Sequence, residues 1–220
     1  MEYKIPFGVR CGIRRKVVLH HTHLIDDIEG LIEDGDMLFL DDALYSQYTW
    51  FYQNVYELMR KHVLVVLGIS TDCVRSPEVA PRPIEKSAIL HDRFHKYIGK
   101  DAIMAEKARD GFMSWKEIGR MLEFPFVYPA NHGHNHLNLN GWRKDLTGAL
   151  ASFMTDISIA QEILELHGMG TDIFVFPYDS EPPGTRQWLR TNGFKYIFGG
   201  TVLDRIEVED LAARRHGETK

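Results

Sequence analysis

Three histidines lie within five residues in the segment NHGHNHLN, which spans residues 131–138. His132 and His136 are four residues apart, so their imidazoles point the same way if the segment forms a helical turn. His134 points away in a helical turn but shares their side in an extended segment. Two neutral imidazoles and one carboxylate form a facial ligand set for a divalent transition metal, with positions left for water and substrate. The cluster therefore predicts a metal site.

Two adjacent carboxylates, Asp41 and Asp42, follow the apolar run MLFL of residues 37–40. In a buried site, like charges raise the pKa of one carboxyl unless a cation lies beside the pair. Neighbours in an extended chain point to opposite sides, so both can face one site only where the strand bends at its end. The alternative interpretation is a turn or a helix N-cap, because Asp is common there and residues 43–45 could begin a helix.

The elements that must position these residues alternate between strand and helix along the chain. Short apolar runs predict strands at residues 16–19, 37–40, 63–69, 124–128, 172–176 and 195–198. Helical spacing of apolar residues predicts helices at 45–60, at 84–121 in two or three pieces, at 146–166 and at 187–190. Within the second of these, Ser114 and Glu117 have the spacing of a capping box. The alternation predicts a parallel α/β sheet or barrel, whose chemistry sits at the carboxyl ends of its strands.

Polar clusters follow three of the predicted strands. They are Asp41-Asp42, the His132–His136 cluster and Pro177-Tyr178-Asp179. Because the carboxyl ends of parallel strands meet at one edge of a sheet, we expect these three clusters to converge. Aromatic rings near such a site could stack on the flat face of a substrate. Tyr48 and Trp115 occupy apolar helical positions that predict core packing instead, which leaves Trp142 as the best stacking candidate.

Composition limits the classes of protein. The 220 residues suit a single domain, and 26 Lys and Arg against 31 Asp and Glu give a net charge of −5, which argues against nucleic-acid binding. The longest apolar stretch, residues 63–67, is a strand length, so neither a transmembrane helix nor a signal peptide is predicted. Two cysteines, Cys11 and Cys73, form no disulfide framework. The expected location is the cytoplasm.

In their order and spacing, these segments resemble the motifs of the polysaccharide deacetylase family, also called the NodB-homology domain or carbohydrate esterase family 4. FLDDA at residues 39–43 is similar to its T-F-D-D-G motif, and HGHNH at 132–136 to its H-[ST]-x-x-H motif. FVFPYD at 174–179 resembles the branch with an F-x-x-P-Y third motif. MSWKEI at 113–118, KVVLHH at 16–21 and GFKYIFGGT at 193–201 resemble further family segments. The resemblance spans about residues 16–206.

The resemblance implies a distorted (β/α) barrel as one domain over residues 1–220, with a helical insertion at about 84–121. It implies that Asp42, His132 and His136 bind one divalent metal ion, usually zinc. Asp41 is then the general base for water held by the metal, and the backbone N–H of Tyr178 is the oxyanion donor. Pro177 and Asp179 would border the substrate, together with Trp142.

The chain departs from the family pattern at several positions. The family's acid is a histidine on a strand near the C-terminus, but here only His216, in a charged tail, follows Thr201. We expect His20 or His21 to replace it, because an imidazole protonates a leaving amine well near neutral pH; His23, Asp179 and Asp41 are the alternatives. The third-motif arginine is absent, Ala43 replaces a glycine that matters if its φ is positive, and Asp179 replaces another glycine.

The implied function is removal of an N-acetyl group from an amino sugar of a glycan, or of a nucleotide-linked or lipid-linked precursor in O-antigen or other surface-polysaccharide synthesis. A deformylase or another small-amide hydrolase is a related alternative. A non-catalytic carbohydrate-binding relic would explain the missing acid but not the complete ligand set. A metallophosphoesterase would need more metals, for which the cluster of His20, His21 and His23 is the available source of ligands.

Overall fold

The computed structural model describes residues 16–18, 28, 30–75, 111–139 and 142–199. Within them, six parallel strands form one sheet in the order β1-β2-β3-β4-β5-β6, so strands consecutive in sequence are neighbours in space. The strands are β1 (Lys16–Val18), β2 (Met37–Leu40), β3 (Leu64–Ile69), β4 (Val127–Asn131), β5 (Ile173–Val175) and β6 (Tyr196–Phe198). All their carboxyl ends therefore lie at one edge of the sheet.

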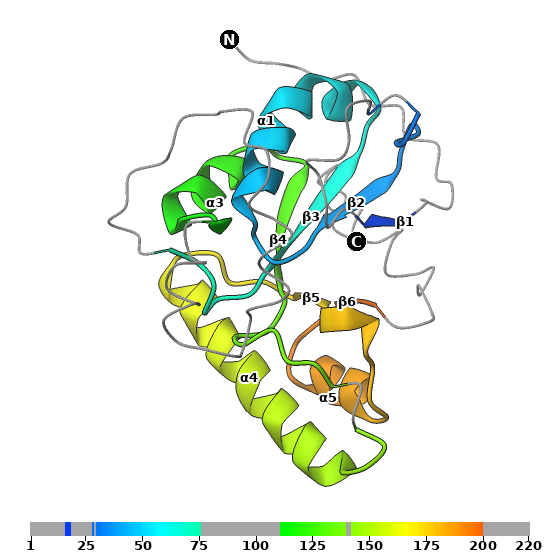
Figure 1. The fold of residues 1–220 in the computed structure, drawn as a ribbon, viewed down its shortest axis with the longest axis vertical. Helices are drawn as coiled ribbons and strands as arrows, with labels where there is room; N and C mark the ends of the chain where they lie inside the picture. Colours follow the sequence, from blue (N-terminus) through cyan, green and yellow to red (C-terminus); the bar gives the residue numbers. More distant parts are fainter. Residues whose placement is uncertain (1–15, 19–27, 29, 76–110, 140–141, 200–220) are drawn as a thin grey trace.

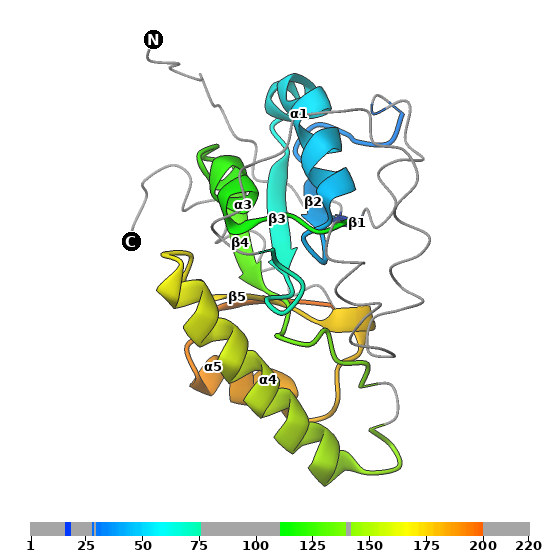
Figure 2. The ribbon, with the colours of Figure 1, turned by 60° about the vertical axis from the view of Figure 1, so that its left-hand side comes forward.

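Helices follow the strands and cover two different parts of the sheet. They are α1 (Tyr45–Arg60), α3 (Trp115–Leu122), α4 (Leu146–Leu166), the short 3₁₀ helix η4 (Pro177–Asp179) and α5 (Thr185–Thr191). Figures 1 and 2 show α1 and α3 together beside β2, β3 and β4, whereas α4 and α5 lie around β5 and β6. This alternation of strand and helix is what buries a parallel sheet.

The sheet curls sharply between β4 and β5. In Figure 1, β2 to β4 run steeply, whereas β5 and β6 run across the view. The register of β4 and β5 consists of a single pair, Asn131 and Phe174, while β3 and β4 share five pairs. The described sheet is thus part of a distorted, partly open (β/α) barrel, as the resemblance implied.

The core lies between the sheet and its helices. Every side chain of β2 and β3 is buried, which explains why these strands are continuous apolar runs rather than alternating ones. Phe51 of α1 packs edge-on against Phe124 and lies 6.0 Å from Phe126 between ring centroids. Tyr48 and Trp115 are buried, which confirms the prediction that both are core residues.

Most predicted elements occur, and two helices have the predicted limits, α1 at 45–60 and α4 at 146–166. The predicted strand at 124–128 is wrong in its position, since β4 covers Val127–Asn131. Phe124 and Phe126 instead pack from the turn after α3, and the strand includes Pro129 and Asn131, residue types of poor β-propensity. The predicted helical pieces before residue 111 and the histidines 20, 21 and 23 lie outside the described residues.

The predicted capping box of α3 is confirmed. The Glu117 N–H donates to Ser114 Oγ at 3.3 Å, and the Ser114 N–H donates to Glu117 Oε2 at 2.7 Å. Both side chains are buried, so they satisfy each other's backbone donors without water. The predicted stop of α4 is also present: Gly168, which follows the C-terminal end of this helix, has φ +70°, the left-handed conformation typical of a helix end.

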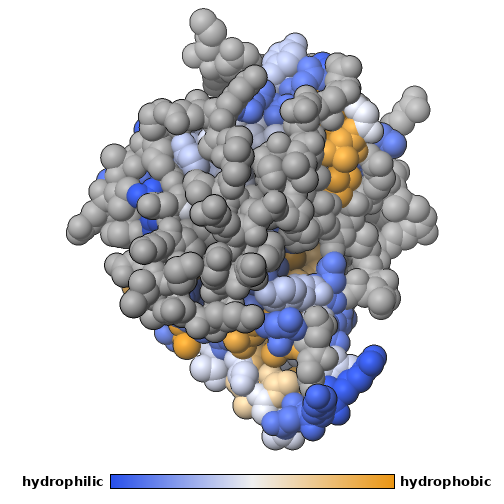
Figure 3. Space-filling model, viewed as in Figure 1, coloured by the Kyte–Doolittle hydropathy of each residue, from blue (hydrophilic) through white to orange (hydrophobic). Residues whose placement is uncertain are grey.

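None of the helices in the described residues is both long and apolar enough to span a bilayer. On the face shown in Figure 3, hydrophilic and hydrophobic residues of the described part are interspersed. Hydrophilic residues gather at its lower end, where α4 begins (Figures 1 and 3). The residues there, 143–147, are all exposed.

Candidate metal centre

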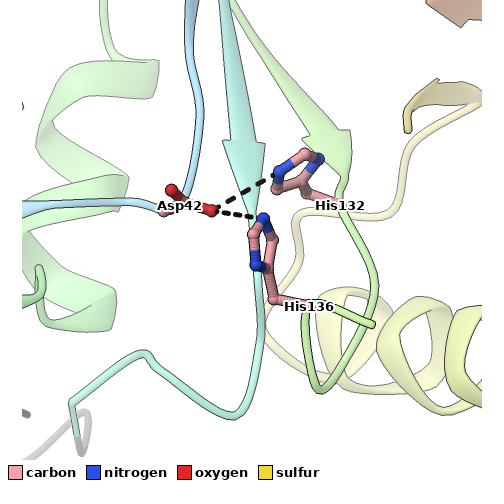
Figure 4. A group of neighbouring side chains, drawn as sticks. All are labelled: Asp42, His132 and His136. Atoms are coloured by element: carbon pink, nitrogen blue, oxygen red, sulfur yellow. Dashed lines mark ion pairs between the residues drawn. The ribbon is translucent and has the colours of Figure 1, made fainter. Parts of the chain in front are cut away.

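The three predicted polar clusters follow β2, β4 and β5 and meet at the carboxyl edge of the sheet. Asp42 comes two residues after β2, His132 directly after β4, and His136 from the loop that continues from it (Figure 4). Their ligand atoms all lie within 4.8 Å of one another, and all three residues are buried. The structure thus brings together the three side chains expected to be metal ligands.

One oxygen of Asp42 faces both imidazoles. His136 Nε2 lies 2.9 Å from Asp42 Oδ1, and His132 Nε2 lies 3.5 Å from the same oxygen. The two imidazole rings are 4.9 Å apart between centroids (Figure 4). Two nitrogens and one carboxylate oxygen converge from three sides, which is a donor set that zinc and similar divalent ions accept.

Asp42 reaches the histidines because the chain turns sharply after β2. Asp42 has φ 77° and Ala43 has φ 56°, both in the left-handed region that non-glycine residues rarely adopt. The expected bend at the end of this strand is confirmed. Of the alternative interpretation, the turn does occur, at residues 42 and 43, but the N-cap does not, because Leu44 is the N-cap residue of α1. Ala43 indeed occupies a positive-φ position.

Backbone strain is concentrated around this site. Six described non-glycine residues have positive φ: Asp42, Ala43, His62, His136, Tyr178 and Asp179. Four of them belong to the three clusters at the strand ends, and Ala43 directly follows Asp42. Such conformations cost on the order of 1–3 kcal/mol each and persist where function needs a particular orientation.

His132 is fixed by a backbone carbonyl. Its Nδ1 lies 2.9 Å from the carbonyl oxygen of Val175 in β5, so Nδ1 carries the proton of the neutral ring. Nε2 then presents a lone pair to the Asp42 carboxylate. Two facing lone pairs need a cation between them, either a proton or a metal ion. A carbonyl behind a ligating imidazole is the usual device that orients a metal-binding histidine.

The pKa values express the same requirement. Burial raises the pKa of the Asp42 carboxyl, but His136 and His132 outweigh it and hold the pKa well below its ordinary value. Burial lowers the pKa of His132, but the charges of Asp41 and Asp42 overcome it and raise the pKa to about 9. The metal-free site therefore retains a proton that a divalent ion would displace.

His136 is held differently. Its φ is 48°, and its Nδ1 is buried with no hydrogen-bond partner among the described residues. The Tyr178 ring packs against the imidazole at 4.5 Å between centroids. Burial raises the pKa of the Tyr178 hydroxyl, and the charges of Asp42 and Cys73 add to this effect. Tyr178 therefore stands at the site with its phenol neutral and its ring against a predicted ligand.

Asp41 lies beside His132, above a glycine of β3. A Cβ atom at Gly68 would come within 2.7 Å of Asp41 Oδ1 and 3.3 Å of His132 Cγ. Only glycine leaves room for both side chains at this point of the strand. Gln47 of α1 holds the same turn from the other side, because its Nε2 donates to the Asp41 carbonyl at 2.6 Å and its Oε1 accepts from the Leu44 N–H.

Four groups around the site were missed at the level of sequence: Gly68, Gln47, the Val175 carbonyl and Asp156. Asp156 of α4 is a buried carboxylate that accepts hydrogen bonds from the loop between the two histidines. A signal for it existed, because it is a charged residue within the buried face of α4 that includes Phe153, Ile157 and Ala160.

The other residues predicted to belong to the site are not among the three facing side chains. His134 is half-buried and turned to Thr71, with Nδ1 at 2.9 Å from the hydroxyl oxygen, rather than to the two facing imidazoles. Pro177 is buried and Asp179 is exposed. Trp142 is half-buried beside the Arg143 guanidinium, in the segment that leads into α4. Figures 1 and 2 place that segment away from the carboxyl ends of β3 and β4.

Several solved structures are similar to the chain, and two of them are deacetylases that match it with a TM-score of 0.50 or more. The de-N-acetylase from Aggregatibacter actinomycetemcomitans has a TM-score of 0.53 at 17% identity, covering 86% of this chain and 76% of that one. The BpsB deacetylase domain from Bordetella bronchiseptica has a TM-score of 0.50 at 18% identity, covering 74% of this chain and 63% of that one, less than two thirds of its length. No protein-family model and no curated protein matches the sequence. The chain thus has the polysaccharide deacetylase fold.

Proposed function

We propose that the protein is a metal-dependent hydrolase that removes an N-acetyl group from an amino sugar of a polysaccharide or its precursor. The observation that carries this proposal is the buried group of Asp42, His132 and His136 at the carboxyl edge of the sheet. The fold is shared with a bacterial de-N-acetylase and a deacetylase domain, which supports the same reaction class.

Asp42, His132 and His136 would hold one divalent ion, for which we propose zinc. When bound, the ion supplies Lewis-acid chemistry, which lowers the pKa of water and polarises the amide carbonyl. The residues fit this role because two imidazole nitrogens and a carboxylate oxygen face one another in a buried space that needs a cation. Three protein ligands leave positions for water and substrate.

Asp41 is the proposed general base. It is buried, it precedes the ligand Asp42, and it lies beside the His132 ring over Gly68. Its carboxylate accepts the proton of the attacking water, and its charge already acts on His132. Gln47 fixes the Asp41 backbone, so the base and the ligand are held by one turn.

The Tyr178 backbone N–H is the proposed oxyanion donor. Within the described part of the chain, this N–H donates no hydrogen bond, whereas those of Asp179 and Ser180 are bonded to Phe176 and Pro177. The contact of the Tyr178 ring with His136 keeps the residue next to the predicted ligands. A preorganised backbone donor at this point would stabilise the charge that develops on the acetyl oxygen.

The proton donor to the leaving amine and the substrate contacts remain proposals from the sequence. His20 or His21 is the proposed acid, and Asp179 and Asp41 are the alternatives among the described residues. Pro177, Asp179 and Trp142 are proposed to border the sugar. We further propose a role in O-antigen or other surface-polysaccharide synthesis, as the branch with an F-x-x-P-Y third motif suggests. A nucleotide-linked or lipid-linked precursor in the cytoplasm is the proposed substrate.

Acetate release from N-acetylated amino sugars tests the proposal. The metal-loaded protein should release acetate, and Asp41→Asn should keep its metal but lose at least about a hundredfold in turnover, the low end of what a general base contributes. Asp72→Asn is the matched control, because Asp72 is an exposed aspartate on the neighbouring loop after β3; it should retain full turnover. Loss of metal from Asp41→Asn would instead make Asp41 a ligand.

A further inference from the structure

The loop that carries His136 gains its shape from contacts outside itself. Gly133 has φ +81° and His136 has φ 48°, so the chain reverses within the five residues from His132 to His136. The N–H groups of His134 and Asn135 donate to a side chain of α4 instead of to backbone carbonyls. This loop therefore depends on a partner that is 21 and 22 residues further along the chain than the two donors.

That partner is Asp156, a carboxylate with only 4% of its surface exposed. Its Oδ2 accepts from the His134 N–H at 2.9 Å. Its Oδ1 accepts from the Asn135 N–H at 2.9 Å and from Asn135 Nδ2 at 2.8 Å. A buried carboxylate is stable only when such donors replace water. Both oxygens thus bind the histidine loop.

Gly133 shows how closely the carboxylate fits under the loop. A Cβ atom at residue 133 would lie 2.5 Å from Asp156 Oδ2, well inside van der Waals contact. The carboxylate therefore occupies the space that any larger residue at position 133 would need. Gly133, which lies between the two predicted ligands in the sequence, therefore packs directly against the Asp156 carboxylate.

We propose that Asp156 is a positioning residue that sets the orientation of His136 and thereby the metal affinity of the site. His132 has the Val175 carbonyl behind its ring, but His136 Nδ1 has no such partner among the described residues. The orientation of the His136 ring thus follows from the backbone of its loop, which Asp156 holds. This inference rests on the proposed metal site and assigns Asp156 no contact with the metal.

The test is the zinc dissociation constant of Asp156→Asn, measured by chelator competition, together with the visible absorption spectrum of the cobalt-substituted protein. An amide keeps the shape but turns an NH₂ group toward backbone donors, so we expect zinc binding to weaken about 10- to 100-fold, as supporting groups of metal ligands commonly show. The cobalt spectrum should change with it, because the ligand field depends on the His136 nitrogen.

Asp145→Asn is the matched control. Asp145 is the N-cap of the same helix, and its Oδ1 accepts from the Gly148 N–H at 2.9 Å, but it lies at the exposed end. It should lower thermal stability without changing zinc affinity or the cobalt spectrum. If Asp156→Asn does not fold, Asn135→Ala is the second variant. Asn135 is exposed, and its substitution removes one hydrogen-bond donor to Asp156. Zinc affinity should then fall several-fold.

Two failures can be told apart. Unchanged zinc affinity and cobalt spectrum in a folded Asp156→Asn, or in Asn135→Ala where that variant is used, would overturn the role of Asp156 and leave the metal site intact. Equal weakening by Asp145→Asn would also overturn it, because the effect would then come from the stability of α4. A wild-type protein that binds no zinc or cobalt would overturn the proposed function and this inference together.

Discussion

His132 and His136 present equivalent nitrogens to Asp42, yet the chain holds them by different means. His132 follows directly from β4, its ring Nδ1–H donates to the Val175 carbonyl of β5, and its ring lies over Gly68 of β3. His136 belongs to a loop in left-handed conformation, tied to α4 through Asp156 and covered by Tyr178. The strand half of the site is thus His132, held by β4 and the neighbouring strands. The loop half is His136, held through side-chain hydrogen bonds to its loop.

The difference has consequences for how each half fails. Strand positions are fixed by the sheet ladder and the core, so the strand half should keep its geometry unless a side chain is forced into it. The loop half depends on a few hydrogen bonds from one carboxylate, so single substitutions should change the metal affinity with less effect on the fold. The experiments below test this division.

The largest effect is expected from removing a ligand. Asp42→Ala, His132→Ala and His136→Ala should each lose bound metal, because a set of three protein ligands cannot hold a divalent ion tightly after losing one. Metal content by elemental analysis and folding by circular dichroism check this. Full occupancy in all three folded variants would show that the site assignment is wrong. Loss of metal from His132→Ala but not from His136→Ala would show that the two histidines are not equivalent ligands.

The second effect concerns pH. Zinc needs a neutral His132, whose pKa in the metal-free protein is raised from 6.5 to about 9. A proton therefore competes with the metal between these values, and zinc affinity should rise by about tenfold per pH unit there. The stability of the metal-free fold should change with pH in the opposite direction. The raised pKa of His132 stabilises this fold below pH 6.5, and the stabilisation is lost as the pH approaches 9.

Chelator competition at several pH values and urea unfolding of the metal-free protein measure the two trends. A zinc affinity that stays constant between pH 6.5 and 9 would contradict the protonated state of His132.

The smallest effect is expected from Gly68→Ala in the strand half. The new methyl group would meet Asp41 and the His132 ring, and such overpacking costs roughly 1–3 kcal/mol of the free energy of unfolding. Gly119→Ala in α3 is the control, because its Cβ would meet only Met169 Cε at 3.7 Å. That change should be neutral or should stabilise the helix by up to about 1 kcal/mol. Equal stabilities of the two variants in urea would refute the close packing above Gly68.

The sequence predicted the parts of the site that follow from periodicity. Apolar runs located β2 and β3, helical spacing located α1 and α4, and polar residues after the strands located Asp42 and His132. These predictions succeed because parallel strands place their carboxyl ends at one edge whatever the details of packing. The resemblance added the pairing of Asp42 with the two histidines.

The sequence could not predict the contacts between segments that have no fixed spacing. Asp156 reaches the His136 loop from α4, and Gln47 reaches Asp41 from α1, through hydrogen bonds that only the packed structure defines. Gly68 was hidden because a glycine in an apolar run gives no sign of which side chains lie above it. The strand at 124–128 was misplaced because the apolar residues Phe124 and Phe126 lie before β4. They pack against Phe51 of α1 and are not part of the sheet.

The most direct test of the metal centre is an anomalous-scattering map from crystals grown with zinc, recorded at the zinc absorption edge. The account predicts one strong peak at about 2.0–2.2 Å from one oxygen of Asp42 and one nitrogen each of His132 and His136. A peak bound elsewhere, or none beside these three residues at full zinc loading, would contradict it.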